Sequence, residues 1–310
     1  MDILKGTNFD FLGRNTTGKV RDIYEQRNRL FLVTTDRHSS FDRIIAHVPW
    51  KGQVLNQVSA WWFEKTRHIV PNHVLAIPDP NVTIAKKCTL VPIEAVVRGY
   101  LTGVTDTAIW TRYSKGQRIF GGGVLPDGMR KNQRLPQAIF DPTTKETLHD
   151  RALTREEMIA QGFITDALFE HVKTTALALF SCGQELAARN GLLLVDTKYE
   201  FGTDENGELM LIDEIHTPDS SRYWQAASYA ARVVAGKEPN YFDKEFLRLW
   251  FKDHSDPYKD KILPEAPLEL IEELSRRYIQ MFEQITGNKF EYGATPAFQR
   301  IERNLRPYAV

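Results

Sequence analysis

The 310-residue sequence contains only two cysteines, Cys88 and Cys182. Two cysteines are too few for a disulfide framework, and they do not have the spacing of metal ligands. The sequence also lacks an apolar run long enough to span a bilayer, and its first residues lack the basic and apolar regions of a signal peptide. These absences predict a cytoplasmic protein with reduced thiols.

An excess of charge of either sign is also missing, because 40 basic residues balance 40 acidic ones. This balance argues against a broad surface for nucleic acid or for an anionic membrane. Local basic sites for small anions remain possible. We therefore expect small-molecule ligands, no nucleic-acid or membrane partner, and a monomer or a small homo-oligomer.

The order of the predicted elements indicates a mixed α+β protein with two lobes, a strand-rich one over 1–97 and a larger helix-and-sheet one over 98–310. Residues 19–24 and 29–35 have the composition of an antiparallel hairpin. Between 114 and 151, glycines and prolines punctuate a stretch that we expect to be a long irregular loop. Helices are predicted over 54–66, 166–190, 220–235, 243–252 and 268–286.

The most informative segment is 194–202, with the sequence LVDTKYEFG. As a strand with period two, it sends Asp196, Lys198 and Glu200 to one face. Three charged side chains in a row are costly to bury unless they serve each other or a ligand. The pattern therefore predicts a functional strand face.

A hairpin is predicted after this strand, because Asn206-Gly207 is a strong signal for a two-residue turn. A turn centred there places Glu200 opposite Asp213. Facing carboxylates destabilise a sheet, but a divalent cation between them would remove the repulsion, and such oxygen ligands suit Mg²⁺ with bound phosphates. We predict a metal hairpin over 196–214; a solvated hairpin face is the alternative interpretation.

The segment 13–19 matches the first seven positions of a Walker A loop, but Val20 replaces the Ser or Thr that would hold Mg²⁺. A strand rather than a helix is predicted to follow, so we reject a P-loop fold. Lys19 and Arg21, predicted on one strand face, remain suited to contacting phosphates. The alternative is a solvated edge strand, on which basic side chains discourage aggregation.

Polar residues beyond strand ends commonly build sites, and Asp36, Ser39 and Asp42 follow an apolar strand directly. A plain polar turn is the alternative. Arg98 follows a second apolar strand, and its guanidinium is suited to bidentate recognition of carboxylate or phosphate.

The segment 217–223 is predicted to start a helix, whose free amides form an anion site. Ser221 and Arg222 would add a hydroxyl and a positive charge to that site. A helix cap without any ligand is the alternative interpretation.

Together these segments resemble the SAICAR synthetase family, the phosphoribosylaminoimidazole-succinocarboxamide synthases of purine biosynthesis. The resemblance runs from 18–24 to 219–224, and 94–100 and 196–202 look like the family's two signature segments. The single-chain length resembles the monofunctional form. The resemblance implies an ATP-grasp-like fold with ATP in the cleft between the two lobes.

The resemblance also implies a reaction, that of an ATP-dependent carbon–nitrogen ligase. ATP phosphorylates the carboxylate of 5-amino-1-(5-phosphoribosyl)imidazole-4-carboxylate (CAIR). The amine of L-aspartate then displaces phosphate to form the succinocarboxamide (SAICAR), with ADP and Pi as the other products. An acyl phosphate is needed because a free carboxylate repels the nucleophile and oxide is a poor leaving group. Positioning and charge neutralisation are therefore the tasks of the protein.

Residue roles follow from the resemblance, and they cover five tasks. Lys19 and Arg21 would cover the ATP phosphates, and Glu94 and Val96 would line the adenine pocket. Asp196 and Lys198 would contact CAIR and neutralise charge at the transferring phosphoryl group. Arg98, Ser221 and Arg222 would bind the CAIR 5′-phosphate. Asp36, Ser39 and Asp42 would face the imidazole and the incoming aspartate, and Glu200 and Asp213 would hold Mg²⁺.

Four positions depart from the usual family pattern: Asp106, Gln137, Asp141 and Arg151. A small hydroxyl residue, Glu, Thr and an acidic residue, respectively, are usual there. All four lie between 103 and 151, away from the predicted metal hairpin. Two alternatives stay open: a small-molecule kinase on the same ATP scaffold, and a nucleotide-binding homologue without catalysis.

Overall fold

The computed structural model describes residues 2–41, 43–105, 107–145, 153–240 and 245–309. The chain divides into two compact units. Unit 1 comprises Met1–Trp62, His73–Lys87 and Phe242–Val310, and unit 2 comprises Phe63–Asn72 and Cys88–Tyr241. The division thus differs from the expected boundary at residue 97, and the C-terminal residues belong with the N-terminal ones.

Unit 1 is built on a five-stranded antiparallel sheet with the order β1-β2-β3-β7-β6. Its strands are β1 (Arg14–Thr17), β2 (Arg21–Gln26), β3 (Arg29–Thr34), β6 (Val74–Asp79) and β7 (Val82–Lys86). The predicted β2–β3 hairpin is confirmed, with Gln26 opposite Arg29. Lys19, predicted on a strand, lies instead in the turn between β1 and β2, where the amide of Gly18 donates to the carbonyl of Arg21.

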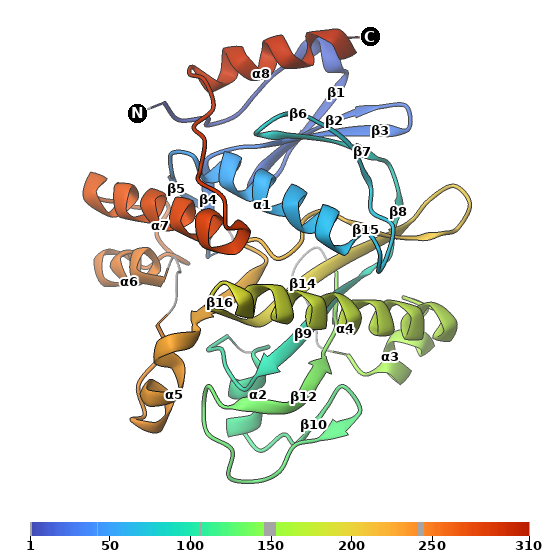
Figure 1. Cartoon of the computed structure of the whole chain (residues 1–310), viewed down its shortest axis with the longest axis vertical. Coiled ribbons are helices and arrows are strands. Elements are labelled where there is room, and N and C mark those ends of the chain that lie inside the picture. The colour runs from blue at the N-terminus through green and yellow to red at the C-terminus, as the bar shows by residue number, and fades with distance from the viewer. Residues whose placement is uncertain (1, 42, 106, 146–152, 241–244, 310) are drawn as a thin grey trace. The chain divides into compact units, whose positions relative to one another are not determined.

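A helix from the far end of the chain completes the core of this sheet. α8 (Ala297–Leu305) buries Ile301 and Leu305 in one cluster with Leu4, Phe9 and Tyr24. Within unit 1, Figure 1 shows this helix beside the N-terminal strands. A buried ion pair adds to the packing, because Arg300 Nε lies 2.9 Å from Asp79 Oδ2.

The remaining helices of unit 1 follow the predicted hydrophobic periodicity. α1 (Lys51–Thr66) buries Val54, Val58 and Trp62, which recur at the four-residue spacing of one helix face. α7 (Leu268–Thr286) ends at Gly287, whose φ of 73° is the left-handed C-cap expected there. The unit also contains α6 (Glu245–His254), the short pair β4 (Arg37–Ser40) and β5 (Arg43–His47), and the 3₁₀ turns Asp10–Leu12 and Arg306–Tyr308.

Unit 2 is built around one long strand, β14 (Leu192–Thr203). The main sheet has the antiparallel order β12-β9-β14-β15, with β16 and β8 also paired to β14 and β13 paired to β9. Its other strands are β8 (Thr89–Leu90), β9 (Ile93–Tyr100), β12 (Arg134–Phe140), β13 (Thr143–Thr144), β15 (Leu209–Ile212) and β16 (Ser221–Gln225).

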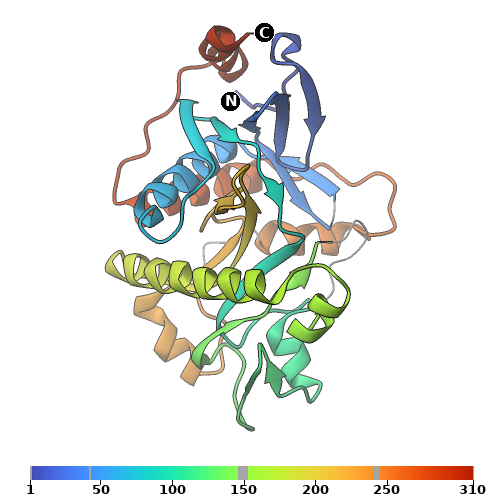
Figure 2. The ribbon, with the colours of Figure 1, turned by 90° about the vertical axis from the view of Figure 1, so that its right-hand side faces the viewer.

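One face of this sheet is covered by α4 (Asp166–Arg189), which crosses β9 and β14 (Figures 1 and 2). The predicted helix is confirmed, with its end one residue earlier than expected, and Phe169, Val172, Leu179 and Phe180 are buried along it. The charged side chains of β14 lie on the opposite face of the sheet. Unit 2 also holds α2 (Ile109–Ser114), α3 (Arg155–Ala160), α5 (Ala226–Val234), β10 (Ile119–Phe120) and β11 (Gly123–Val124).

Two predicted elements of unit 2 are wrong. The stretch from 114 onward is not a long irregular loop, since it contains β10, β11, β12 and β13. The helix predicted over 220–235 is divided into β16 and α5, because Tyr223 and Trp224 are buried and pair with Leu194 and Leu193 in the ladder with β14. In the parts of the chain that the structure describes, no helix has the length and apolar character needed to cross a membrane.

Candidate active site

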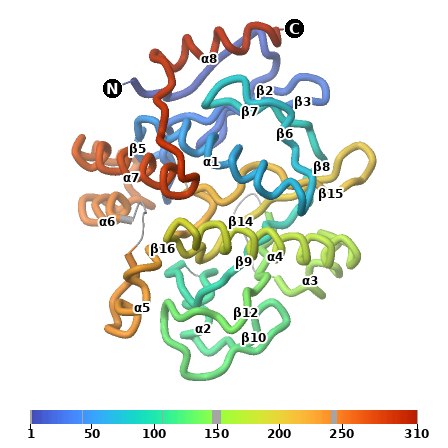
Figure 3. The backbone as a smooth tube through the Cα atoms, in the orientation of Figure 1, coloured from blue at the N-terminus to red at the C-terminus, as the bar shows by residue number. Residues whose placement is uncertain are grey.

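The hairpin that was predicted to carry the metal has a different register. β14 pairs Glu200 with Ile212, not with Asp213, and the ladder ends at Thr203 and Leu209. The loop between them is longer than the expected two residues, because the side chain of Asp204 accepts the amides of Asn206 (2.9 Å) and Glu208 (3.0 Å) and holds it open. Figure 3 follows the backbone from β14 into β15.

Asp213 nevertheless belongs to the same charged neighbourhood. It follows the last residue of β15 with a φ of 66°, a left-handed conformation that is uncommon for a residue other than glycine. Its negative charge acts on Lys198, together with those of Glu200 and Glu94. Burial of the Lys198 ammonium opposes its charge, but the three carboxylates outweigh burial and raise the pKa of Lys198 above its ordinary value.

The predicted charged face of β14 is confirmed by the contacts of Lys198. Its Nζ donates to Glu200 Oε1 at 2.7 Å and to Glu94 Oε1 at 3.0 Å. The second oxygen of Glu200 accepts the ammonium of Lys145. The buried charges therefore do serve each other, which is the condition for placing them on a strand that is buried along most of its length.

Lys145 is a member of this cluster that the sequence did not reveal. It follows β13 directly, and its partner Glu200 is 55 residues away along the chain. The β13–β9 pairing brings the two together, since Thr143 lies opposite Glu94. No local pattern signals such a contact, because it depends on the pairing of three strands.

A second row of charges crosses the three strands β9, β14 and β16. Asp196 is the ladder partner of Arg98 on one side and of Arg222 on the other. Arg222 Nη2 lies 3.6 Å from Asp196 Oδ2. The sheet thus brings together three residues that the sequence assigned to substrate binding or catalysis.

Arg98 has a further carboxylate partner that the sequence analysis identified only as a departure from the family pattern. Its Nε donates to Asp141 Oδ2 at 2.6 Å, and Arg112 donates to the same oxygen. All three side chains are at most 15% exposed. Two guanidinium groups that converge on one carboxylate leave one net positive charge at this corner, beside Asp196.

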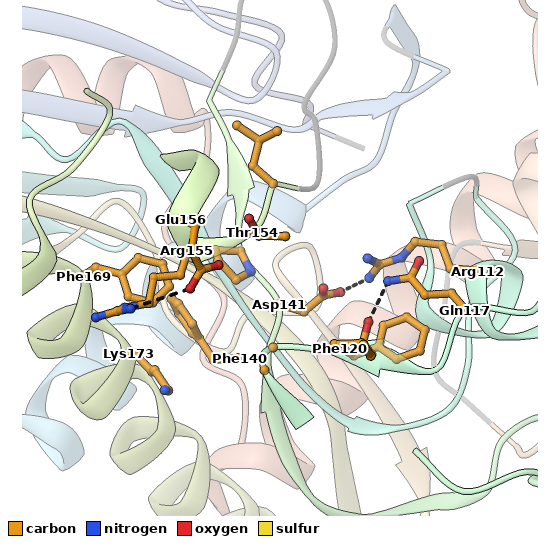
Figure 4. Close-up of a pocket in the computed structure, with 15 residues that line it drawn as sticks. Arg112, Gln117, Phe120, Phe140, Asp141, Thr154, Arg155, Glu156, Phe169 and Lys173 are labelled. Atoms are coloured by element: carbon orange, nitrogen blue, oxygen red, sulfur yellow. Dashed lines mark hydrogen bonds and ion pairs between the residues drawn. The ribbon is translucent and has the colours of Figure 1, made fainter. Parts of the chain in front are cut away.

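This corner borders a cavity of about 370 Å³, whose lining includes Arg112 and Asp141. Figure 4 shows the two side chains joined on one side of the cavity, and Phe140 and Phe169 also line it. Arg155 and Lys173 add two cations on the other side. The cavity therefore combines an aromatic surface with charged rims.

Ser221 is not part of a helix start, as predicted, but the first residue of β16. Strand alternation places it opposite Thr197, and the two hydroxyl oxygens are 2.7 Å apart. Arg222 is on the other face, with Asp196. The two residues predicted to share a phosphate site thus point to opposite faces of the sheet, because a strand alternates where a helix start would not.

Glu94 and Val96, predicted to line an adenine pocket, both lie in β9 beside Lys198. The carboxylate of Glu94 is bound to the ammonium of Lys198, and Val96 is the ladder partner of Lys198. The carbonyl of Val96 accepts the amide of Asp141 at 2.8 Å. Contact with adenine stays a prediction for both residues.

Four predicted site residues belong to unit 1 and are described within it. Lys19 lies in the β1–β2 turn, Arg21 begins β2, and Ser39 lies in β4. Asp36 is buried, and its two oxygens accept the amides of Leu4 and Gly52, each at 2.9 Å. Burial raises the pKa of Asp36 to about 6, although both amides work in the opposite direction.

These bonds give Asp36 a role in the fold, where it ties the N-terminal segment to the start of α1. Its contact with substrate stays a prediction, as do the ligand contacts of the three other residues. Asp42, a predicted substrate residue, lies outside the described residues, and so do two departures from the family pattern, Asp106 and Arg151.

The donor set around Lys198 fits a magnesium ion that also has phosphate ligands. Among the described residues, no group of three or more His, Cys, Asp or Glu side chains could hold a metal ion alone. Mg²⁺ in nucleotide sites is commonly bound by one or two carboxylates, with phosphate oxygens and water completing its octahedron. Glu200 and Asp213 supply carboxylates of that kind, both acting on one ammonium.

Comparison with known proteins gives one consistent result. The family model described as SAICAR synthetase matches residues 14–264. A phosphoribosylaminoimidazole-succinocarboxamide synthase of Legionella pneumophila (strain Paris) is 57% identical over 296 residues, which are 95% of each chain. The chloroplastic synthase of Arabidopsis thaliana is 55% identical over 289 residues, 93% of this chain and 70% of that one.

A solved structure shares the fold as well. The SAICAR-synthase of Saccharomyces cerevisiae, complexed with SAICAR, is similar with a TM-score of 0.81 at 30% sequence identity. The likeness covers 93% of this chain and 100% of the yeast chain.

Proposed function

The chain belongs to the SAICAR synthetase family, a family of ligases that join CAIR and L-aspartate in purine biosynthesis, and we propose that it performs this reaction on the charged face of β9, β14 and β16. The observation that carries the proposal is the position of Lys198. Its ammonium is shared between Glu200 and Glu94, with Asp213 acting on it and the Arg98–Asp196–Arg222 row two residues away along the strand.

The arginine row suits the phosphate end of CAIR. A guanidinium presents several donors in a fixed plane and matches phosphate oxygens, so Arg98 and Arg222 are assigned to the 5′-phosphate. Asp196 lies between them in the ladder, and its negative charge offsets part of the repulsion between the two guanidinium groups. Ser221 faces the other side of the sheet, where its hydroxyl is hydrogen-bonded to that of Thr197.

The cluster formed by Lys198, Lys145 and their carboxylate partners is suited to the carboxylate end of CAIR, where the phosphoryl group is transferred. Lys198 is held protonated by its carboxylates, and a fixed positive charge stabilises the negative charge that develops at a transferring phosphoryl group. Lys145 adds a second ammonium at Glu200. Lys198 reaches the site from β14, and Lys145 reaches it from the residue directly after β13.

Glu200 and Asp213 would hold Mg²⁺ in this proposal. The ion would supply positive charge to the phosphates of ATP. Lys19 and Arg21 are assigned to the ATP phosphates, and Glu94 and Val96 to the neighbourhood of the adenine. The ATP-grasp-like binding of the nucleotide belongs to the same proposal.

The test is ADP release by the purified protein with Mg²⁺-ATP and CAIR, with and without L-aspartate, while SAICAR is followed alongside. Aspartate-dependent formation of SAICAR that is lost in Glu200→Gln and in Asp213→Asn is the expected result. Glu208→Gln is the matched control, since this carboxylate is exposed in the loop of the same hairpin.

The outcomes separate the alternatives. A small-molecule kinase would leave the phosphoryl group on its product and release no Pi. A nucleotide-binding homologue without catalysis would bind ADP or ATP and form no amide. Either result would overturn the ligase assignment for this chain.

A further inference from the structure

A buried hydrogen bond lies behind the charged face of β14. The hydroxyl of Tyr199 is 2.5 Å from Nε2 of His216, and both side chains are completely buried. Tyr199 stands between Lys198 and Glu200 in the strand, so its ring points to the face opposite theirs. The bond therefore links the back of the proposed catalytic strand to the segment after β15.

A glycine in α4 makes room for this bond. A Cβ atom at Gly183 would overlap Cε1 of His216 and would lie 2.9 Å from its Nδ1. The backbone of His216 is also held, because the hydroxyl of Tyr223 donates to its carbonyl at 2.7 Å. Three elements, α4, β14 and β16, thus fix both the ring and the main chain of His216.

The segment held in this way has an unusual backbone. Asp213 and His216 have φ values of 66° and 51°, both left-handed, and neither is glycine. Such conformations persist only where the surrounding structure determines them. Between the two residues, Ile215 is fully buried, and Asp213 is half-buried at the other end of this short strained turn.

We propose that Tyr199, His216 and Gly183 form a latch that positions Asp213 for its metal. The latch sets the turn from behind, and the turn sets the Asp213 carboxylate beside Lys198 and Glu200. This inference rests on the proposed function, which makes Asp213 a metal ligand. The three latch residues are positioning residues, because none of them reaches the charged face.

The latch works between two neutral groups. Burial lowers the pKa of His216 to about 3 and raises that of Tyr199 well above its ordinary value. Loss of one partner leaves a buried ring nitrogen without its bond, which costs more than loss of the bond alone. Without this bond, we expect the imidazole of His216 to shift toward another hydrogen-bond partner. The turn from His216 back to Asp213 would shift with it.

The test measures binding of Mn²⁺, as a substitute for Mg²⁺, to the whole protein in the presence of ADP. Free Mn²⁺ is followed by electron paramagnetic resonance, and thermal unfolding is recorded for every variant. Tyr199→Phe and Gly183→Ala are each expected to weaken Mn²⁺ binding by about tenfold, the smaller end of the effect found for residues behind metal ligands.

Tyr113→Phe is the matched control. It removes another buried hydroxyl of unit 2, which bonds the carbonyl of Pro126 at 2.7 Å and lies in α2. Its unfolding temperature should fall while its Mn²⁺ affinity stays that of the parent protein. The same pattern in both Tyr199→Phe and Gly183→Ala would overturn the latch.

Removing the latch altogether gives a second measurement. Tyr199→Phe with His216→Leu leaves no unpaired nitrogen, and two apolar side chains fill the slot. Stability is expected to return toward that of the parent protein, while Mn²⁺ affinity stays about tenfold weaker, as in Tyr199→Phe, because nothing then sets the turn to Asp213. A double variant that recovers both stability and the Mn²⁺ affinity of the parent protein would contradict the inference.

Two further variants separate this inference from the proposed function. If Glu200→Gln and Asp213→Asn bind Mn²⁺ like the parent protein, the metal site itself is wrong. If these two lose Mn²⁺ and the latch variants keep it, the metal site stands and the latch fails.

Discussion

Lys198 and Glu200 form an ion pair of 2.7 Å between alternate residues of one strand. Alternate residues of a strand lie on the same face, so the geometry of β14 alone brings the two side chains together. Glu200 is also bound by Lys145, and Lys198 by Glu94. The pair is therefore the centre of a four-residue network that joins β14, β9 and the residue that follows β13.

We predict that Lys198→Met lowers kcat by about 10²–10³-fold, the loss found when one preorganised donor to a transition state is removed. The methionine keeps much of the side-chain volume and removes the charge together with the hydrogen bonds that the ammonium donates. Steady-state formation of SAICAR measures the effect. A kcat within threefold of the parent value would show that Lys198 does not act on the reacting group.

Arg222→Gln is expected to raise the KM for CAIR by about tenfold or more, with a smaller effect on kcat. A hydrogen bond between charged groups contributes about 1.5–3 kcal/mol, and here it would be lost equally from bound substrate and transition state. Arg189→Gln is the control, since Arg189 is exposed on α4 and pairs with Glu185. Equal KM values for both variants would exclude Arg222 from the phosphate site.

Asp141→Asn should lower the free energy of unfolding by about 3 kcal/mol, because it leaves two largely buried guanidinium groups without their shared carboxylate. Chemical denaturation measures the loss. Adding Arg112→Met should restore part of it, since one cation is then removed with the anion. Additive losses in the double variant would show that Asp141 and Arg112 are not coupled.

The buried Asp36 predicts a pH dependence of stability. Its pKa is about 6 in the folded protein and 3.8 as the ordinary value, so between these pH values the folded state binds the extra proton. The stability from this group is present below about pH 4 and is lost as the pH rises through 6, by roughly 3 kcal/mol at most. In Asp36→Asn this dependence should disappear.

Denaturant titrations at pH 4, 5, 6 and 7 test this comparison. The difference in unfolding free energy between the parent protein and Asp36→Asn should shrink as the pH rises. A difference that grows with pH would mean that the carboxylate is stabilised, rather than penalised, by its buried position.

Much of the candidate site could be predicted because strand periodicity is local. Asp196, Lys198 and Glu200 do share one face of β14, as their spacing predicted. The register with β15 could not be obtained in the same way, because Asp204 closes a longer loop than Asn206-Gly207 indicates. The pairing is shifted by one residue, so Glu200 lies opposite Ile212 in the ladder and not opposite Asp213.

Contacts between segments that are distant in the sequence were the main features that could not be predicted. The pattern of 221–225 did not reveal β16, whose partner is the first half of β14, and nothing near Lys145 points to Glu200. Asp141 stood out only as a change from the family pattern, although it joins Arg98 to Arg112. Periodicity shows which residues share one face of a helix or strand, but it does not show which other element that face contacts.

The ion pair between Arg300 and Asp79 joins residues 221 positions apart in the chain. On the ribosome, the N-terminal sheet is therefore synthesised long before α8, the helix that covers it. Until α8 is made, the apolar residues that it covers stay exposed to solvent. The sheet and helices of unit 2, which come largely from the continuous stretch Cys88–Tyr241, can fold during that interval. The order of translation thus favours folding of unit 2, which contains the Arg98–Asp196–Arg222 row and the cluster around Lys198, before unit 1 is complete. A chain that is truncated before α8 would keep an uncovered, aggregation-prone sheet.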